Sequence, residues 1–80
     1  MKVIVHSWRV SSWLKDLPSF MDGVRFSFSI RCTIAETGEE CIMHHVSELN
    51  RQSLAFRQAE CQGECEINSA WWIKEELEGI

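Results

Sequence analysis

The sequence predicts an α+β fold: a small antiparallel β-sheet of three or more strands with a central hairpin, packed by one or two α-helices. Two observations predict the sheet. Apolar and polar residues alternate strictly over residues 24–34, and a second strand-like segment follows a glycine-containing turn. Helices are predicted because segments with helix-capping residues follow at 47–62 and 68–78. With 80 residues, 45% of them apolar, the chain is expected to form one domain spanning residues 1–80.

Residues 24–34 form the best-defined predicted strand. Every second side chain is apolar, and a period of two is typical of a β-strand, whose successive side chains point to opposite faces. The apolar set is Val24, Phe26, Phe28, Ile30, Cys32 and Ile34. One face of this strand is therefore expected to be buried and the other solvated.

Residues 2–10 are rich in β-branched side chains and predict a second strand. Uninterrupted alternation would place four side chains on one face: Ile4, His6, Trp8 and Val10. In the connection at residues 11–23, Ser11 or Ser12 is expected to cap a single helical turn through Leu17, which the following proline stops. The apolar side chains of this connection either cover one end of the core or dock a partner.

Residues 39–47 are expected to return antiparallel to the strand at 24–34. Gly38 fits the last position of a tight turn between them. This turn would place Cys32 near Met43 on the buried face. A slip of the register by one residue would reverse the facing of every side chain on the return strand.

A helix is predicted over residues 48–62. Ser47 is expected to be its N-cap, and Gly63 is expected to follow its C-terminus. The apolar stripe on this segment is modest, so the helix is expected to be only weakly amphipathic.

The C-terminal segment allows two interpretations. Residues 64–68 are short and alternating and predict an edge strand or a connector. Residues 70–78 are predicted to form a final helix, and the competing interpretation is a strand over residues 70–74, because Trp and Ile also favour sheets.

The net charge of −4 is unevenly distributed along the chain. Residues 1–34 carry five basic and two acidic residues, a net of +3, whereas residues 35–80 carry ten Glu and three basic residues, a net of −7. The acidic second half opposes direct binding to nucleic acid and favours a basic partner, although a Glu-rich solvated surface has the same composition.

The sequence has no apolar run long enough for a signal peptide or a membrane span. It therefore predicts a cytoplasmic protein that does not enter a membrane. In that compartment its four cysteines are expected to be reduced.

No catalytic or cofactor motif is present in the sequence, which predicts a protein that is not an enzyme and needs no cofactor. Cys41, His44, Cys61 and Cys65 have the donor types of a zinc site. The paired Cys-x-x-Cys spacing of zinc ribbons is absent, so no metal is predicted. A zinc- or thiol-stabilised domain with a structural or nucleic-acid-binding role is the alternative.

Glutamates and tryptophans are interleaved near the C-terminus. At an interface, Trp would act as the anchor and Glu as the charge that steers a basic partner. The alternative is that the Trp side chains belong to the core and the Glu side chains are solvated. The predicted partner-binding residues are Glu64, Glu66, Trp71, Glu75, Glu76 and Glu78.

The hairpin at 24–46, the Glu-rich segment 64–78 and the lack of catalytic motifs together resemble a class of small phage-encoded inhibitors, the anti-CRISPR proteins. The resemblance lies in size, acidity and composition across the whole chain. It implies a binding protein that occludes a basic, DNA-binding surface of a partner such as a CRISPR effector complex. It also implies that the protein acts in the cytoplasm of a bacterial host, by shape as much as by mimicry of DNA.

Overall fold

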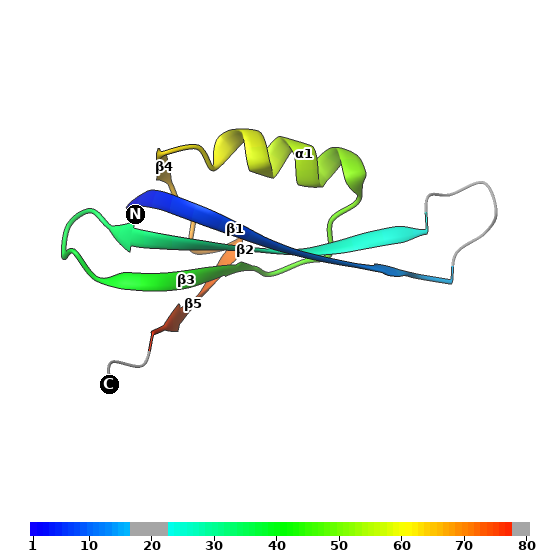
Figure 1. Ribbon diagram of the computed structural model, residues 1–80, viewed down its shortest axis with the longest axis horizontal. Coiled ribbons are helices and arrows are strands. Elements are labelled where there is room, and N and C mark those ends of the chain that lie inside the picture. The colour runs from blue at the N-terminus through cyan, green and yellow to red at the C-terminus, as the bar shows by residue number, and fades with distance from the viewer. Residues whose placement is uncertain (17–22, 78–80) are drawn as a thin grey trace.

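The computed structural model describes residues 1–16 and 23–77. Their elements are β1 (Lys2–Leu14), β2 (Val24–Ile34), β3 (Glu40–His45), α1 (Arg51–Glu60), β4 (Glu64–Glu66) and β5 (Trp72–Glu76). The strands form one antiparallel sheet in the order β4-β1-β2-β3-β5, and α1 lies along one side of the β1–β2 hairpin (Figure 1). The predicted α+β class is wrong, because the sheet dominates and curls into a half-barrel with one short helix.

The prediction for β2 is confirmed with the same bounds, Val24–Ile34. Its apolar side chains lie on the face that forms the core, here called the inner face, and Phe28, Ile30 and Cys32 are almost completely buried. The polar side chains lie on the opposite, outer face, as strict alternation requires.

A β-bulge in β1 overturns the predicted facing of that strand. Val5 pairs with Cys32 but Ser7 pairs with Arg31, so His6 is an extra residue. Val3 and Val5 therefore share the inner face with Trp8 and Val10, the positions beyond the bulge. His6 is bonded on the outer face, where its Nε2 lies 2.6 Å from the Thr33 hydroxyl.

β1 also continues further than predicted. Residues 11–14 pair with residues 24–27 as a strand, so the predicted helical turn is wrong over this stretch. Residues 15 and 16 are not helical either, and only Leu17 of the predicted turn lies outside the described residues. The ladder partner explains the difference, because an extended β2 satisfies the backbone groups that a helical turn would otherwise bond internally.

The β2–β3 hairpin is confirmed, but its register differs by two residues from the predicted one. Cys32 pairs with Cys41 and Ile30 pairs with Met43. A shift of two keeps every side chain on its predicted face. Gly38 closes the turn with a φ of 75°, a conformation that favours glycine.

The predicted helix is confirmed as α1, which is shorter than expected. Its N-cap is Asn50, whose side-chain oxygen accepts from the Ser53 amide at 2.7 Å, and not the predicted Ser47. The helix is held against β2 because Leu49 and Phe26 exchange backbone hydrogen bonds of 3.0 and 2.8 Å. The helix ends at its C-cap Cys61, so Gly63 lies two positions beyond the cap rather than directly after it, the predicted position. Its φ of 56° is a conformation that favours glycine.

Within the described residues, no helix has the length and apolar character needed to span a membrane.

Asn50→Ala is expected to lower the free energy of unfolding by about 1 kcal/mol, because it removes the capping acceptor. Ser47→Ala is the matched control and should change stability by less than about 0.5 kcal/mol. Urea denaturation followed by tryptophan fluorescence measures both. Equal losses in the two variants would contradict the assignment of Asn50 as the cap.

The predicted C-terminal helix is wrong over residues 72–76, which form β5, and the competing strand interpretation is right in kind. β5 pairs with β3, where Trp72 lies opposite His45. Trp72 is buried and its ring lies 5.9 Å from that of Phe28, whereas Ile73 on the outer face is exposed. A strand thus satisfies the edge of β3 and buries one tryptophan at the same time.

Candidate functional site

The side chains of Arg57 and Trp71 meet between α1 and the β4–β5 connection. The Arg57 guanidinium carbon lies 5.8 Å from the centroid of the Trp71 ring, within the range of a cation–π interaction. The Trp71 ring also stacks on that of His45, with the ring centroids 6.3 Å apart and an interplanar angle of 14°. Trp71 is nevertheless 46% exposed, so it is not a core residue. It is an exposed aromatic side chain whose position is fixed by these two neighbouring side chains.

An acidic hollow of about 510 Å³ lies on one side of this pair. Its lining includes the carboxylate residues Glu60, Glu64 and Glu66 together with Arg57 and Trp71. The carboxylates come from the end of α1 and from β4. The hollow therefore offers three acidic groups beside an exposed indole.

Each carboxylate of the acidic hollow has an internal cation. Glu64 lies 3.1 Å from the Lys2 ammonium, and Glu66 lies 2.6 Å from the amino group of Met1. Glu60 lies 3.0 Å from Arg57. The hydrogen bond from the amino group lowers the pKa of Glu66 and keeps it ionised. Exposed ion pairs of this kind contribute little stability, so a cation of a partner can replace these internal cations.

A second hollow of about 420 Å³, here called the mixed hollow, lies on the other side of the pair. The apolar residues Leu49, Phe56 and Trp71 line it together with polar residues that include Ser47, Gln52 and Ser53. Phe56 is 62% exposed on the solvent side of α1, an uncommon place for a large aromatic side chain. The acidic hollow and the mixed hollow thus lie next to each other and share the Arg57–Trp71 pair.

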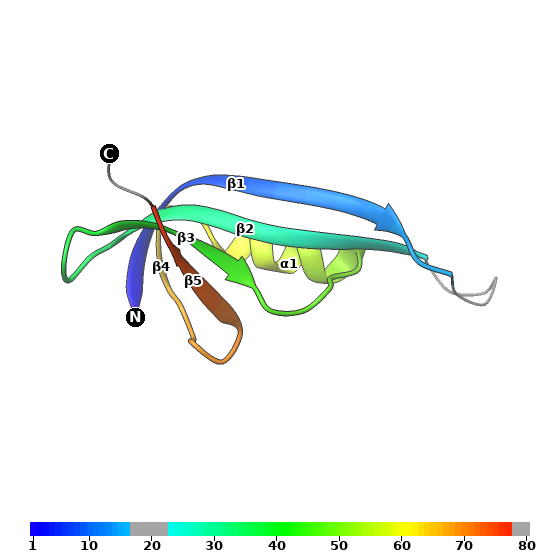
Figure 2. The ribbon, with the colours of Figure 1, turned by 90° about the horizontal axis from the view of Figure 1, so that it is seen from below.

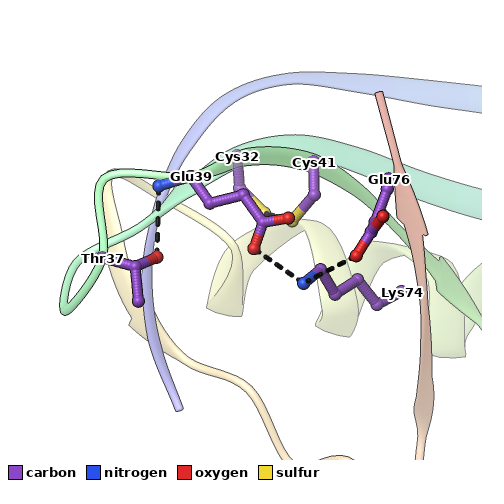
Figure 3. A network of polar contacts seen from close by, with 6 residues as sticks. All are labelled: Cys32, Thr37, Glu39, Cys41, Lys74 and Glu76. Carbon is purple, nitrogen blue, oxygen red and sulfur yellow. Dashed lines mark hydrogen bonds and ion pairs between the residues drawn. The ribbon is translucent and has the colours of Figure 1, made fainter. Parts of the chain in front are cut away.

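The structure brings together three of the six predicted partner-binding residues: Glu64, Glu66 and Trp71. Glu75 lies on the outer face, where its Oε2 is 3.3 Å from His44 Nε2. Glu76 lies 3.7 Å from the Lys74 ammonium (Figure 3). Glu78 lies outside the described residues. β4 and β5 are opposite edges of the sheet, and this separates the glutamates that the sequence places close together.

Lys74 carries two acidic partners. Its ammonium lies 2.7 Å from Glu39 and also approaches Glu76 (Figure 3). The hydrogen bond with Glu39 raises the pKa of Lys74, so the ammonium stays charged. Glu76 is therefore part of a local network that joins β5 to the start of β3.

The donor set named for zinc is not assembled. Cys41 points to the inner face, whereas its near neighbour His44 points to the outer face and bonds to Ser29. Among residues 1–16 and 23–77, no group of three or more metal-ligating side chains is placed to hold an ion. Cys61 is only 3% exposed, so Cys61→Ser would bury a hydroxyl and destabilise the fold whether or not a metal is bound.

A hydrogen-bonded chain on the outer face was not predicted. The Ser29 hydroxyl lies 2.7 Å from His44 Nδ1, and the other ring nitrogen of His44 faces Glu75. These three residue types are those of a hydrolytic triad, but Ser29 is 8% exposed in a sheet surface and does not present its oxygen to a substrate. The arrangement fixes the orientation of His44. No sequence signal marks it, because its members lie on three different strands.

Comparison of the chain with protein-family models, with curated proteins and with solved structures found no match.

Proposed function

We propose that this protein is a non-catalytic binding protein that inhibits a protein or nucleoprotein partner by occluding a basic, DNA-binding surface, in the manner of anti-CRISPR proteins. The observation that carries this proposal is the acidic hollow beside the exposed Trp71. A protein surface that binds nucleic acid presents Lys and Arg side chains to the phosphates and flat apolar side chains on which bases stack. The acidic hollow complements the cations, and the exposed Trp71 and Phe56 side chains complement the apolar surface.

Trp71 is the proposed anchor of this interface. Its ring is already held between His45 and Arg57, so binding costs little side-chain entropy. Large aromatic side chains at the centre of a patch commonly dominate binding free energy. Phe56, which lines the mixed hollow, adds apolar area that is exposed in the free protein.

The carboxylates supply steering and specificity. Glu64 and Glu66 have only exposed internal partners, and a cation on the partner protein can displace them at small cost. The charge of −4 on the whole chain adds a weaker long-range attraction. Because the charged groups lie at the rim, salt is expected to slow association more than it speeds dissociation.

The double variant Glu64→Lys, Glu66→Lys is expected to lose its partner. The measurement is affinity purification of the tagged protein from a bacterial lysate that contains CRISPR effector complexes, followed by a DNA-binding assay with the effector retained. The wild type should hold one stoichiometric partner, release it in high salt and block its binding to DNA. The double variant should retain at least about tenfold less, because two repulsive contacts replace two attractive ones.

The double variant Glu36→Lys, Glu40→Lys is the matched control, because it makes the same charge change at two exposed positions of the β2–β3 hairpin. It should bind like the wild type. If the control loses as much binding as the double variant, net charge and not the acidic hollow is responsible. If neither variant changes retention, or the retained partner still binds DNA, the proposed function is wrong.

A further inference from the structure

β1 is much longer than the strand beside it. β4 pairs only with residues 2–4, and the Val5 amide then donates to the Gly63 carbonyl at 2.7 Å. Beyond this point, the described residues supply no backbone partner for the edge of β1 that faces away from β2, over residues 8–14. These residues are called the open edge below.

The open edge belongs to an arm that projects from the domain. Figures 1 and 2 show the β1–β2 hairpin extending past the end of α1 in both views. The radius of gyration is 14.0 Å. A compact domain of this length would have a radius of about 12 Å. The arm therefore exposes a two-stranded ribbon, a structure that is marginal in water without further pairing.

The ladder geometry shows which backbone groups are free. The Lys15 amide donates to the Gly23 carbonyl at 2.7 Å, so the odd-numbered residues of the arm bond to β2. The even-numbered residues, on the same argument, direct their N–H and C=O groups to the open edge: Trp8, Val10, Ser12 and Leu14. The bulge at His6 causes this, because it reverses the parity that Val5 follows beside β4.

Proteins usually protect such an edge with Pro, Lys, an inward-pointing charge or a covering segment. Residues 8–14 contain no Pro and no Lys, and their one charged residue, Arg9, lies on the outer face. Their large apolar side chains are exposed, most of all Leu14 at 81%. The open edge therefore has the features of a strand that pairs with another strand.

We propose that the open edge pairs antiparallel with the open edge of a second copy of this chain, about a two-fold axis at Ser11. Ser11 is the midpoint of residues 8–14, so this register pairs the whole open edge. It sets Trp8 opposite Leu14 of the second copy and Val10 opposite Ser12 of the second copy. All of these residues direct backbone groups to the edge, so the pairing forms about eight backbone hydrogen bonds.

Side chains are complementary in this register. On the inner face, Trp8 covers the exposed Leu14 of the second copy. On the outer face, Arg9 lies opposite Trp13 of the second copy, which allows a cation–π contact. The two Arg9 side chains are four positions apart, roughly 13 Å. A register centred on Val10 would instead place them on diagonal positions about 7 Å apart, where like charges repel.

Val10→Pro tests the pairing. Proline is tolerated on an edge strand where its missing N–H faces outward, so the β1–β2 ladder should survive. By symmetry the variant loses two intermolecular hydrogen bonds, and the dimer Kd should rise by about 30-fold. Sedimentation velocity should show the wild type at twice the 9.3 kDa of the chain and the variant shifted to monomer.

Val10→Thr is the matched control, because it keeps the backbone N–H, and it should remain dimeric. Circular dichroism checks that both variants are folded.

Ser11→Cys tests the axis without perturbing the fold. Two such thiols face each other across a non-hydrogen-bonded pair, a position that suits a disulfide. Copper-catalysed air oxidation should link the variant into a covalent dimer, whereas Ser7→Cys, also on the outer face, should not cross-link. A wild type that stays monomeric, a dimer that survives Val10→Pro, or a dimer that Ser11→Cys does not link would each overturn the proposal. The proposal does not depend on the acidic hollow, so it can fail while the proposed function stands.

Discussion

Phe28→Ala is expected to remove a large part of the free energy of unfolding of this protein. Phe28 is 1% exposed, and its ring packs between those of Trp8 and Trp72, at 6.4 and 5.9 Å. Removing a buried phenyl ring costs about 3–5 kcal/mol through lost burial and the cavity left behind. An 80-residue domain has only about 4–12 kcal/mol of stability in total. Near-ultraviolet circular dichroism and urea denaturation measure the loss.

Phe56→Ala is the matched control for this prediction. It removes the same ring from the exposed side of α1, where Phe56 is 62% exposed, and should cost less than about 1 kcal/mol. Phe28→Leu, which keeps most of the volume, should give a folded protein with an intermediate loss. If Phe28→Ala costs no more than Phe56→Ala, the inner face of β2 is not the core of this fold.

The strands differ in how well the sequence predicts them. β2 was predicted with its exact bounds because apolar and polar residues alternate along its whole length and the strand itself contains no bulge. β1 was predicted as a strand, but the facing of its side chains was not. One extra residue, His6, inverts everything after it, and neither the need for a bulge nor its place shows in composition.

The prediction of the fold class was wrong chiefly at the C-terminal segment, where a strand forms in place of the predicted helix. The segment around Trp72 carries side chains that suit either a helix or a strand, and local propensity does not separate the two. The open edge of β3 decides the outcome, because pairing with it satisfies backbone groups and buries Trp72. A single-sequence pattern contains no information on which edge is available.

The candidate site was half predictable for a similar reason. Glu64, Glu66 and Trp71 come together because the chain turns between β4 and β5 at the rim of the acidic hollow. Glu75 is near them in sequence, but strand alternation sends it to the outer face. Arg57 and Phe56, which complete the two hollows, come from α1 and gave no signal as binding residues.

The buried thiols give the second large expected effect. Burial raises the pKa of Cys32 to about 12, with a smaller contribution from the neighbouring Cys41 thiol at 3.9 Å (Figure 3). Burial likewise raises the pKa of Cys61 to about 12, with Cys65 contributing. Because the thiolate is the reactive form, both cysteines should be inert in the folded protein at neutral pH.

The same shift gives a direction to the pH dependence of stability. A pKa raised on folding means that the unfolded chain loses its thiol protons first, from the ordinary value of 9.0 upward. The contribution of these thiols to stability is therefore complete below about pH 9 and declines as the pH rises toward 12. Chemical denaturation at a series of pH values above neutrality measures it, and a stability that increases over this range would contradict the burial of these thiols.

Alkylation of Cys32 and Cys61 by iodoacetamide at about pH 8 should be roughly 1,000-fold slower in the folded protein than in denaturant. A rise in pKa from 9.0 to about 12 lowers the thiolate fraction by about that factor, and burial slows the reagent further. Peptide mass spectrometry resolves the rate at each cysteine.

Cys65 is the internal comparison, because it is only partly buried and should react first. Rapid modification of Cys32 without loss of folded signal would contradict its place in the core, whereas modification at the rate of global unfolding would confirm that the thiol is reached only when the sheet opens.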